Sequence, residues 1–224
     1  MKLLYEDKFL LVAEKPANIL SEPSDGGADI VSLLSEELKT PVFPVHRLDR
    51  NTGGAMVLTK NSSLAGKLSA AIQNREFQKE YFAVVKGQPE EAEGTFEDLL
   101  FKDSSKNKTI VVKRERKGVK KASLSYRVLV STDTDGGEIS LILVRLHTGR
   151  THQVRVQFAS RKMPLLGDGK YGSRDNRCET ALWSARLSFT HPVTGKPITT
   201  ISRPPRDYPW NLFPESDFVT GHFD

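Results

Sequence analysis

The stretch PVHRLDRNTGG, residues 44–54, places one carboxylate among cations, since Asp49 follows His46, Arg47 and Leu48 directly. An aspartate between charged neighbours is usually a solvated loop residue. A carboxylate that stays ionised in a cleft is instead a usable nucleophile or base, provided that a nearby cation offsets the cost of its burial. If Asp49 carries chemistry, another part of the chain must supply that cation.

The segment THQVRVQFAS, residues 151–160, contains a candidate cation. Read as a helix, it places Arg155 on one apolar stripe with Val154 and Phe158. An arginine on an inward face needs a carboxylate, because an uncompensated buried charge costs about 3–5 kcal/mol and a guanidinium does not lose its proton. Two interpretations stay open: the side chain extends to the surface, or it pairs with Asp49, our best candidate for the partner.

A tyrosine in the segment KEYFAVVKG could complete such a site. In a strand, Tyr81 shares one face with Ala83 and Val85. Its ring can therefore line a pocket among small apolar neighbours and offer its hydroxyl. Taken alone, an ordinary core tyrosine explains the pattern as well.

The charge of the chain is concentrated in one place. Its formal net charge is +5, yet residues 102–121, here called the basic segment, hold nine Lys or Arg against two acidic residues, a net charge of +7. Such a concentration of positive charge attracts polyanions, of which nucleic acid is the most common. A solvated hairpin tip is the alternative. The cations that we select as candidate nucleic-acid contacts are Lys113, Arg114, Arg116, Lys117, Lys120 and Lys121.

Strands that are joined by short turns position these residues. Strand patterns occur at 9–16, 55–60, 79–87, 109–113, 122–131, 139–146, 181–189 and 198–202, and helical patterns at 29–38, 62–76 and 151–160. Asp135-Gly136-Gly137 is typical of a hairpin turn. The pattern predicts an α+β fold with a mixed or mainly antiparallel sheet. We expect one catalytic domain over residues 1–224, with two halves that share a sheet.

Several classes of protein are excluded by what the sequence lacks. It has no P-loop, dinucleotide fingerprint, His-Glu-x-x-His or Cys-x-x-Cys pattern, and its five histidines do not form a ligand cluster. We therefore expect no metal bound by the histidines. A single cysteine, Cys178, excludes an internal disulfide and favours a reducing compartment. The N-terminus resembles neither a signal peptide nor a membrane span, so we expect a cytoplasmic protein, by default a monomer.

Taken together, three segments resemble RluA-type RNA pseudouridine synthases. HRLDRNTGG resembles the signature His-Arg-Leu-Asp-x-x-Thr-Ser-Gly, KEYFAVVKG resembles Lys-x-Tyr-x-Ala-x-Val-x-Gly, and LHTGRTHQVRVQ with PLLGDGKYG resembles the family's third motif region. Order and spacing agree from about Leu11 to Phe189. Each motif is weak alone, but three in sequence are specific.

The resemblance implies the pseudouridine synthase fold, a mixed, mainly antiparallel sheet flanked by helices with a central active-site cleft. It also implies a role for each matching residue. Asp49 would be the catalytic aspartate, Tyr81 would stack on the uracil, and Arg155 would hold the Asp49 carboxylate. Residues beside them would contact the RNA or shape the cleft: His46, Arg47, Leu48, Arg150, His152 and Gln153. The implied reaction is the isomerisation of specific uridines in structured ribosomal or transfer RNA, without a cofactor. Whether Asp49 acts on the sugar or on the base stays open.

Two positions depart from the family's pattern, and we expect one segment of the family to be absent. We take Gly54 as the residue that replaces the family's usual serine, and we expect it to loosen the turn. Gln157 replaces the family's usual histidine. The chain also begins at the catalytic region, so we expect no N-terminal accessory RNA-binding domain. RNA recognition would then depend on the catalytic domain, with the basic segment as our candidate.

Two other functions compete with this interpretation. A non-catalytic RNA-binding or ribosome-assembly protein would need the basic segment but not Asp49, Tyr81 and Arg155 together. A hydrolase of free nucleotides would not need the basic segment. Tritium release from uridine-labelled RNA distinguishes the first, and a comparison of free uridine with transcripts distinguishes the second.

Overall fold

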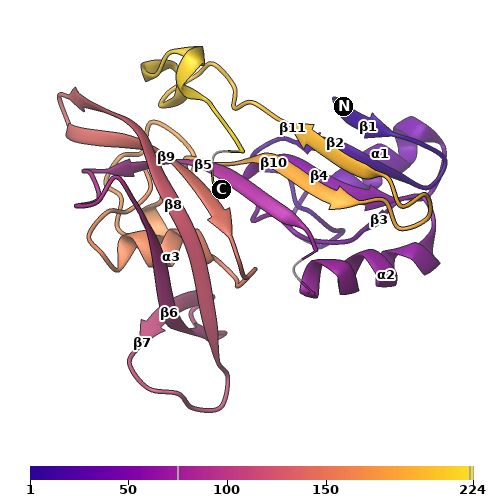
Figure 1. The fold of residues 1–224 in the computed structure, drawn as a ribbon, viewed down its shortest axis with the longest axis horizontal. Helices are drawn as coiled ribbons and strands as arrows, with labels where there is room; N and C mark the ends of the chain where they lie inside the picture. The colour runs from indigo at the N-terminus through magenta and orange to yellow at the C-terminus, as the bar shows by residue number, and fades with distance from the viewer. Residues whose placement is uncertain (75, 222, 224) are drawn as a thin grey trace. The chain divides into compact units, whose positions relative to one another are not determined.

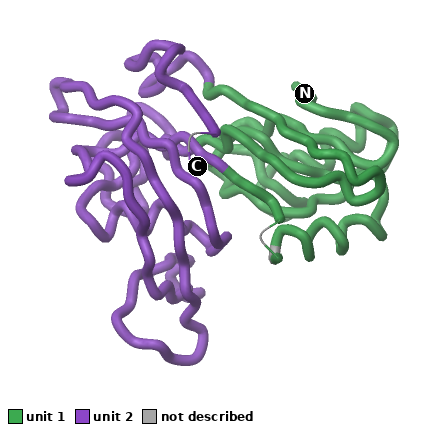
Figure 2. The backbone as a smooth tube through the Cα atoms, viewed as in Figure 1, with its two compact units in different colours: residues 1–79, 183–204 green, residues 80–182, 205–224 purple. Residues whose placement is uncertain are grey.

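The computed structural model of the chain describes residues 1–74, 76–221 and 223. The backbone forms two compact units (Figure 2). The first unit contains residues 1–79 and 183–204, and the second contains residues 80–182 and 205–224. Both combine strands with helices, which confirms the predicted α+β class.

The first unit contains strands in the order β1-β2-β4-β10, with β11 beside β10 and β3 beside β4 (Figure 1). β4 is parallel to β10 and antiparallel to β2, so the sheet is mixed. Buried side chains of β2 and β4, such as Val12 and Val57, form its core. The elements are β1 (Leu3–Glu6), β2 (Leu10–Lys15), α1 (Ile30–Leu38), β3 (Phe43–Pro44), β4 (Gly53–Thr59), α2 (Ser62–Gln73), β10 (Leu182–Thr190) and β11 (Pro197–Ile201).

The second unit contains strands in the order β5-β9-β8-β6-β7, with antiparallel pairing throughout this series. Figure 1 shows that β6, β7 and β8 extend together away from the rest of the unit, on the side where α3 lies. The elements are β5 (Gln78–Lys86), β6 (Glu93–Asp103), β7 (Lys108–Val112), β8 (Val119–Thr134), β9 (Gly137–Leu146) and α3 (Gln153–Ala159), with 3₁₀ turns η1 (Gly169–Tyr171), η2 (Trp210–Leu212) and η3 (Glu215–Asp217).

Both longer helices begin where the sequence places a capping side chain. Asp29 accepts the Ser32 N–H at 2.8 Å and starts α1, as predicted. Asn61 accepts the Ser63 N–H at 2.9 Å and starts α2. The predicted helix over 62–76 is shorter in the structure, and Arg75 lies outside the described residues.

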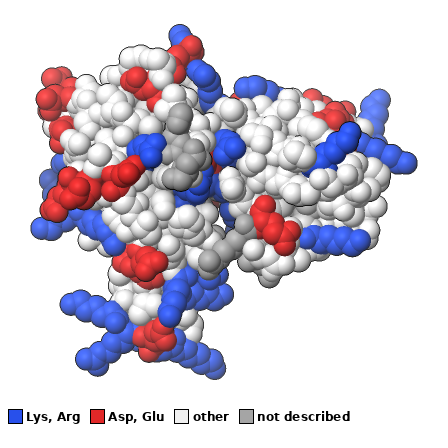
Figure 3. Space-filling view, in the orientation of Figure 1, with Lys and Arg blue, Asp and Glu red and all other residues white. Residues whose placement is uncertain are grey.

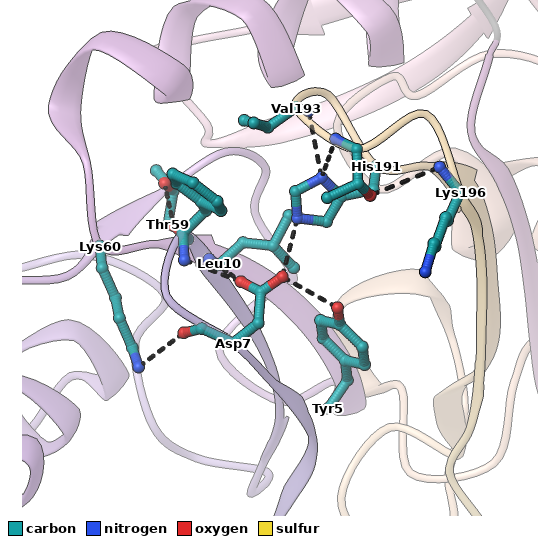
Figure 4. Close-up of polar contacts among 10 residues, drawn as sticks. Tyr5, Asp7, Leu10, Thr59, Lys60, His191, Val193 and Lys196 are labelled. Carbon is teal, nitrogen blue, oxygen red and sulfur yellow. Dashed lines mark hydrogen bonds and ion pairs between the residues drawn. The ribbon is translucent and has the colours of Figure 1, made fainter.

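In the first unit, the buried His191 connects the turn between β10 and β11 to the turn between β1 and β2 (Figure 4). His191 Nε2 lies 2.8 Å from Oδ2 of Asp7, and its Nδ1 accepts the N–H groups of Val193 and Thr194 at 3.1 and 3.0 Å. Because Nδ1 is an acceptor, the proton is on Nε2 and is donated to the carboxylate. Asp7 thereby links the β1–β2 turn to the β10–β11 turn.

Neither a membrane-spanning helix nor a metal site is found among the described residues. No helix among them is both long and apolar enough to cross a membrane. Nor does any group of three or more His, Cys, Asp or Glu within this part of the chain have an arrangement that could hold a metal ion.

Candidate active site

Hydrogen bonds on both sides hold the backbone around Asp49 in the first unit. The Ser21 hydroxyl accepts the Leu48 N–H at 3.0 Å and donates to the Leu48 carbonyl at 2.8 Å. On the other side, the Thr52 N–H donates to the Asp49 carbonyl at 3.0 Å. The Leu48 side chain, which we predicted to meet substrate, is buried at 6% exposure. It therefore anchors the loop while the half-buried Asp49 remains accessible.

A buried lysine at the end of β2 lies close to this loop. The Lys15 side chain is 0% exposed, and its Nζ donates to the carbonyls of Pro16, Ile19 and Arg50 at 2.9, 2.6 and 3.1 Å. Burial lowers the Lys15 pKa to about 8, and the nearby Asp49 carboxylate acts in the opposite direction. Sequence analysis missed Lys15. A lysine that lies two residues after a buried apolar run and directly precedes a proline was the available signal.

The two glycines after Thr52 are required by the close approach of β10. A Cβ added at Gly53 would lie 2.2 Å from the Trp183 ring, and one at Gly54 would lie 2.3 Å from the Ser184 carbonyl oxygen. Gly54 also has a φ of +109°, which side-chain-bearing residues rarely adopt. Two expectations are thereby corrected. Thr52 directly precedes Gly53, so the family's serine aligns with Gly53 rather than Gly54, and the turn is tightly packed rather than loosened.

His46 has a structural partner within its own unit. Its Nε2 accepts the Val57 N–H at 3.0 Å, which fastens the loop to β4. Burial, assisted by nearby Lys79, lowers the His46 pKa to about 3, so the ring is neutral at pH 7. Arg47 beside it is exposed. Contact of either residue with RNA stays a prediction.

Tyr81 lies on β5 in the second unit, opposite Val144 of β9. Its side chain is 6% exposed. The preceding Glu80 is fully buried and accepts the Arg145 Nη2 at 2.9 Å, an ion pair that holds β5 against β9. Tyr81 thus has a fixed position on a rigid strand, as a stacking platform requires.

Arg155 has a carboxylate partner that sequence analysis did not identify. Its Nε donates to Oδ2 of Asp168 at 2.7 Å, and its Nη2 donates to Oδ1 at 2.8 Å. Both side chains are buried, with exposures of 8% and 1%. The predicted requirement for a compensating carboxylate is therefore met by Asp168 within the second unit. The pairing of Arg155 with Asp49 joins residues of different units and stays a prediction.

A glycine places Asp168 next to α3. Gly167 has a φ of +72°, and a Cβ there would lie 2.2 Å from the Glu179 carbonyl oxygen. The chain can make this approach only without a side chain. Upstream, the Leu166 N–H donates to the Val84 carbonyl at 2.9 Å, so β5 also supports the segment. The GDG sequence within PLLGDGKYG was the signal for this partner.

The turn before α3 is organised by Gln153. Its Oε1 accepts the Thr148 hydroxyl at 2.7 Å and the Arg150 N–H at 3.1 Å, and its Nε2 donates to the Ser123 carbonyl at 3.0 Å. Arg150 is exposed and donates from Nε to the Lys121 carbonyl at 3.0 Å. Gln153 and Arg150 therefore join α3 to β8, the strand that carries part of the basic segment.

Gln157, which departs from the family's pattern, fastens α3 to β6. Its Nε2 donates to Oδ2 of Asp98 at 2.8 Å and to the Phe96 carbonyl at 3.2 Å. Arg161 also donates to Asp98, at 2.9 Å. The glutamine thus keeps a buried hydrogen-bonding role on the helix that carries Arg155.

The basic segment covers β7, the start of β8 and the two loops at the end of the β6–β7–β8 group. Figure 3 shows Lys and Arg side chains gathered at this end. The six cations predicted to contact RNA are all exposed: Lys113, Arg114, Arg116, Lys117, Lys120 and Lys121. Lys120 and Lys121 lie on β8, and the other four lie in the loop before it. Exposed cations of this kind can contact a polyanion without being neutralised by a buried partner.

Comparisons with known proteins agree on one family. A family model described as RNA pseudouridylate synthase matches residues 9–160. The chain is 33% identical over 217 residues to an uncharacterized RNA pseudouridine synthase of Aquifex aeolicus (strain VF5), covering 88% of this chain and 67% of that protein. It is 30% identical over 223 residues to tRNA pseudouridine synthase C of Pasteurella multocida (strain Pm70), covering 89% of each.

Two further comparisons bear on length and fold. Ribosomal large subunit pseudouridine synthase D of Borreliella burgdorferi is 34% identical over 185 residues, which cover 77% of this chain and 55% of that protein. The chain spans about two thirds of the length of other relatives, 67% and 65% in two of them. The structure titled Human RNA Pseudouridylate Synthase Domain Containing 4 has a similar fold, with a TM-score of 0.74 at 23% identity, over 91% of this chain and 88% of that one.

Proposed function

Because this chain belongs to the RNA pseudouridylate synthase family, we propose that it converts specific uridines of ribosomal or transfer RNA to pseudouridine. The support is the loop around Asp49. Its backbone is fixed on both sides, and a buried lysine lies near its carboxylate. Such preorganisation is what an acid–base or nucleophilic carboxylate needs.

In the proposed reaction, the bond between uracil N1 and ribose C1′ breaks and a bond between C5 and C1′ forms. The C5 proton is lost to solvent, and N1 takes up a proton. The reaction is an isomerisation, so it needs neither an oxidant nor a hydrolytic water. Asp49 acts on the sugar or on the base ring, Tyr81 stacks on the uracil, and Arg155 stabilises the Asp49 carboxylate.

The uridine must leave its stack to reach Asp49, at a cost of a few kcal/mol that is least in loops. Loop uridines are therefore the proposed targets, and stacking on Tyr81 offsets about 1–3 kcal/mol of that cost. The exposed cations of the basic segment supply the affinity for phosphates. His46, Arg47, Arg150 and His152 would contact RNA near the target. We propose a monomer in which both units form one catalytic domain, acting in the cytoplasm.

Mapping of pseudouridine in total RNA tests this function. A strain that lacks the gene should lose pseudouridine at one or a few loop positions of ribosomal or transfer RNA. Return of the gene should restore those positions, whereas a gene encoding Asp49→Asn should not. Identical maps in the deletion strain and its parent would refute the proposal.

A further inference from the structure

The segment Asp168–Tyr171 contacts both α3 and β7 in the second unit. Asp168 pairs with Arg155 of α3 as described above. Two residues later, Lys170 Nζ donates to the carbonyl of Asn107, directly before β7, at 2.9 Å. Tyr171, the last residue of the segment, contacts both α3 and β7. Four consecutive residues therefore join the helix of the candidate site to the strand that enters the basic segment.

The Tyr171 hydroxyl has two hydrogen-bond partners. It accepts the Thr109 N–H of β7 at 2.9 Å and lies 2.9 Å from Nδ1 of His152, at the start of α3. The oxygen accepts a hydrogen bond from the Thr109 N–H, which leaves the hydroxyl's own hydrogen available to His152. Burial raises the pKa of Tyr171, which keeps the hydroxyl protonated at neutral pH. With His152 Nδ1 as the acceptor of this hydrogen, the ring proton would lie on Nε2.

The ring of Tyr171 has a separate role. It packs in a buried cluster with Leu100, Ala122 and Val156, and the Arg155 guanidinium lies 5.2 Å from its centroid. A phenylalanine would satisfy all of these contacts. The hydroxyl is therefore needed only for the polar link between β7 and His152.

We propose that Tyr171 is a positioning residue of the synthase, whose hydroxyl fixes the His152 tautomer and holds the basic segment against α3 for RNA binding. This inference rests on the proposed function, because it assumes that RNA contacts both the basic segment and the start of α3. A ligand that contacts two elements binds more tightly when those elements are held in their bound arrangement.

Tyr171→Phe removes the hydroxyl and keeps the ring, and Tyr126→Phe is its matched control. Tyr126 is also buried, its ring lies 5.9 Å from that of Phe158 on α3, and its hydroxyl makes only a 3.4 Å contact with the Glu91 carbonyl. Both variants lose one hydroxyl beside the same helix. Only the first loses a link to His152 and β7.

Two measurements on the full chain test the proposal. Nitrogen NMR of the imidazoles, with His152→Gln to assign the signal, should show an unprotonated Nδ1 in the wild type and in Tyr126→Phe, and mixed tautomers in Tyr171→Phe. Filter binding should use RNA extracted from the deletion strain. We expect the RNA affinity of Tyr171→Phe to be about tenfold weaker, because this variant loses one or two hydrogen bonds. The affinity of Tyr126→Phe should change little.

A third measurement separates positioning from catalysis. In Tyr171→Phe, Arg155 still pairs with Asp168 and still lies over the aromatic ring at position 171. The rate of tritium release at saturating RNA should therefore be unchanged in this variant. An unchanged His152 tautomer, or an RNA affinity equal to that of Tyr126→Phe, would overturn the proposal. Absence of tritium release by the wild type would refute the proposed function alone, since tautomer and affinity do not depend on turnover.

Discussion

The guanidinium of Arg155 and the carboxylate of Asp168 form a two-point ion pair in the interior of the second unit, with donor–acceptor distances of 2.7 and 2.8 Å. Two parallel N–H···O bonds fix the plane of the guanidinium as well as its position. The geometry leaves Arg155 compensated within its own unit. A guanidinium has five N–H donors, and two of them bind Asp168. The proposed contact with Asp49 would use others.

Asp168→Asn should destabilise the protein by about 3–5 kcal/mol, because it removes the charge of one partner of a buried ion pair with Arg155. Chemical denaturation measures the change in the free energy of unfolding. Glu93→Gln is the matched control, since Glu93 also contacts an arginine, Arg127, but both side chains are exposed. It should cost no more than about 1 kcal/mol. Equal losses in the two variants would show that burial of the Arg155 pair is unimportant.

Gly53→Ala should destabilise the first unit by about 1–3 kcal/mol, the usual cost of overpacking, because the new methyl group meets the Trp183 ring. Gly66→Ala provides the comparison, since a Cβ at Gly66 of α2 has no heavy atom within 4 Å. That change should stabilise the helix by up to about 1 kcal/mol. Thermal unfolding of both variants checks the opposite signs. A stabilising Gly53→Ala would contradict the close approach.

The Asp7 carboxylate should contribute to stability above about pH 4. Burial raises its pKa, but the N–H groups of Leu10 and Phe9, with Tyr5 and His191, lower it by more, and the net direction is downward. A carboxyl with a lowered folded-state pKa stabilises the protein above its unfolded-state pKa, and this contribution is lost as the pH falls through the folded-state value.

Unfolding curves of the wild type and Asp7→Asn should therefore differ most at neutral pH, by about 1–3 kcal/mol, and converge as the pH falls through the folded-state pKa of Asp7. Asp25→Asn, at an exposed loop position, is the control and should give a small difference at every pH. A difference for Asp7→Asn that stays constant from neutral pH to acid would rule out titration of this carboxyl as the cause.

Replacement of Lys113, Arg114, Lys117 and Lys120 by glutamine should weaken RNA binding and flatten its dependence on salt. Each lost phosphate contact should reduce the slope of log affinity against log salt by about 0.7–0.9. Four exposed lysines of the first unit, Lys2, Lys8, Lys39 and Lys67, provide a control with the same change in net charge. Equal slopes in the two variants would assign the effect to net charge rather than to the basic segment.

Much of the fold follows from local patterns. Strands such as β2 and β5 have apolar runs that end in a proline or glycine, and α1 has Asp29 as its cap, so neighbouring residues determine their limits. β6 was missed because charged residues such as Glu97 and Asp98 interrupt its apolar pattern. Its partner β8 supplies the pairing that the local sequence does not indicate.

The site was predicted less completely, for a physical reason. That Arg155 needs a carboxylate follows from burial on an inward helix face, but which carboxylate serves depends on long-range packing. The structure uses Asp168, placed by the backbone of Gly167. Lys15 was missed for the same reason, because its three carbonyl partners come together only after β2 and the Asp49 loop have packed.

The central claim is that Asp49 performs the chemistry, and tritium release tests it directly. RNA labelled with tritium at uridine C5 loses the label when C5 forms the new bond to the ribose. Wild-type protein and Asp25→Asn should release tritium from RNA of the deletion strain, whereas Asp49→Asn should bind that RNA with similar affinity and release none. Release by Asp49→Asn at a rate close to that of the wild type would contradict the account.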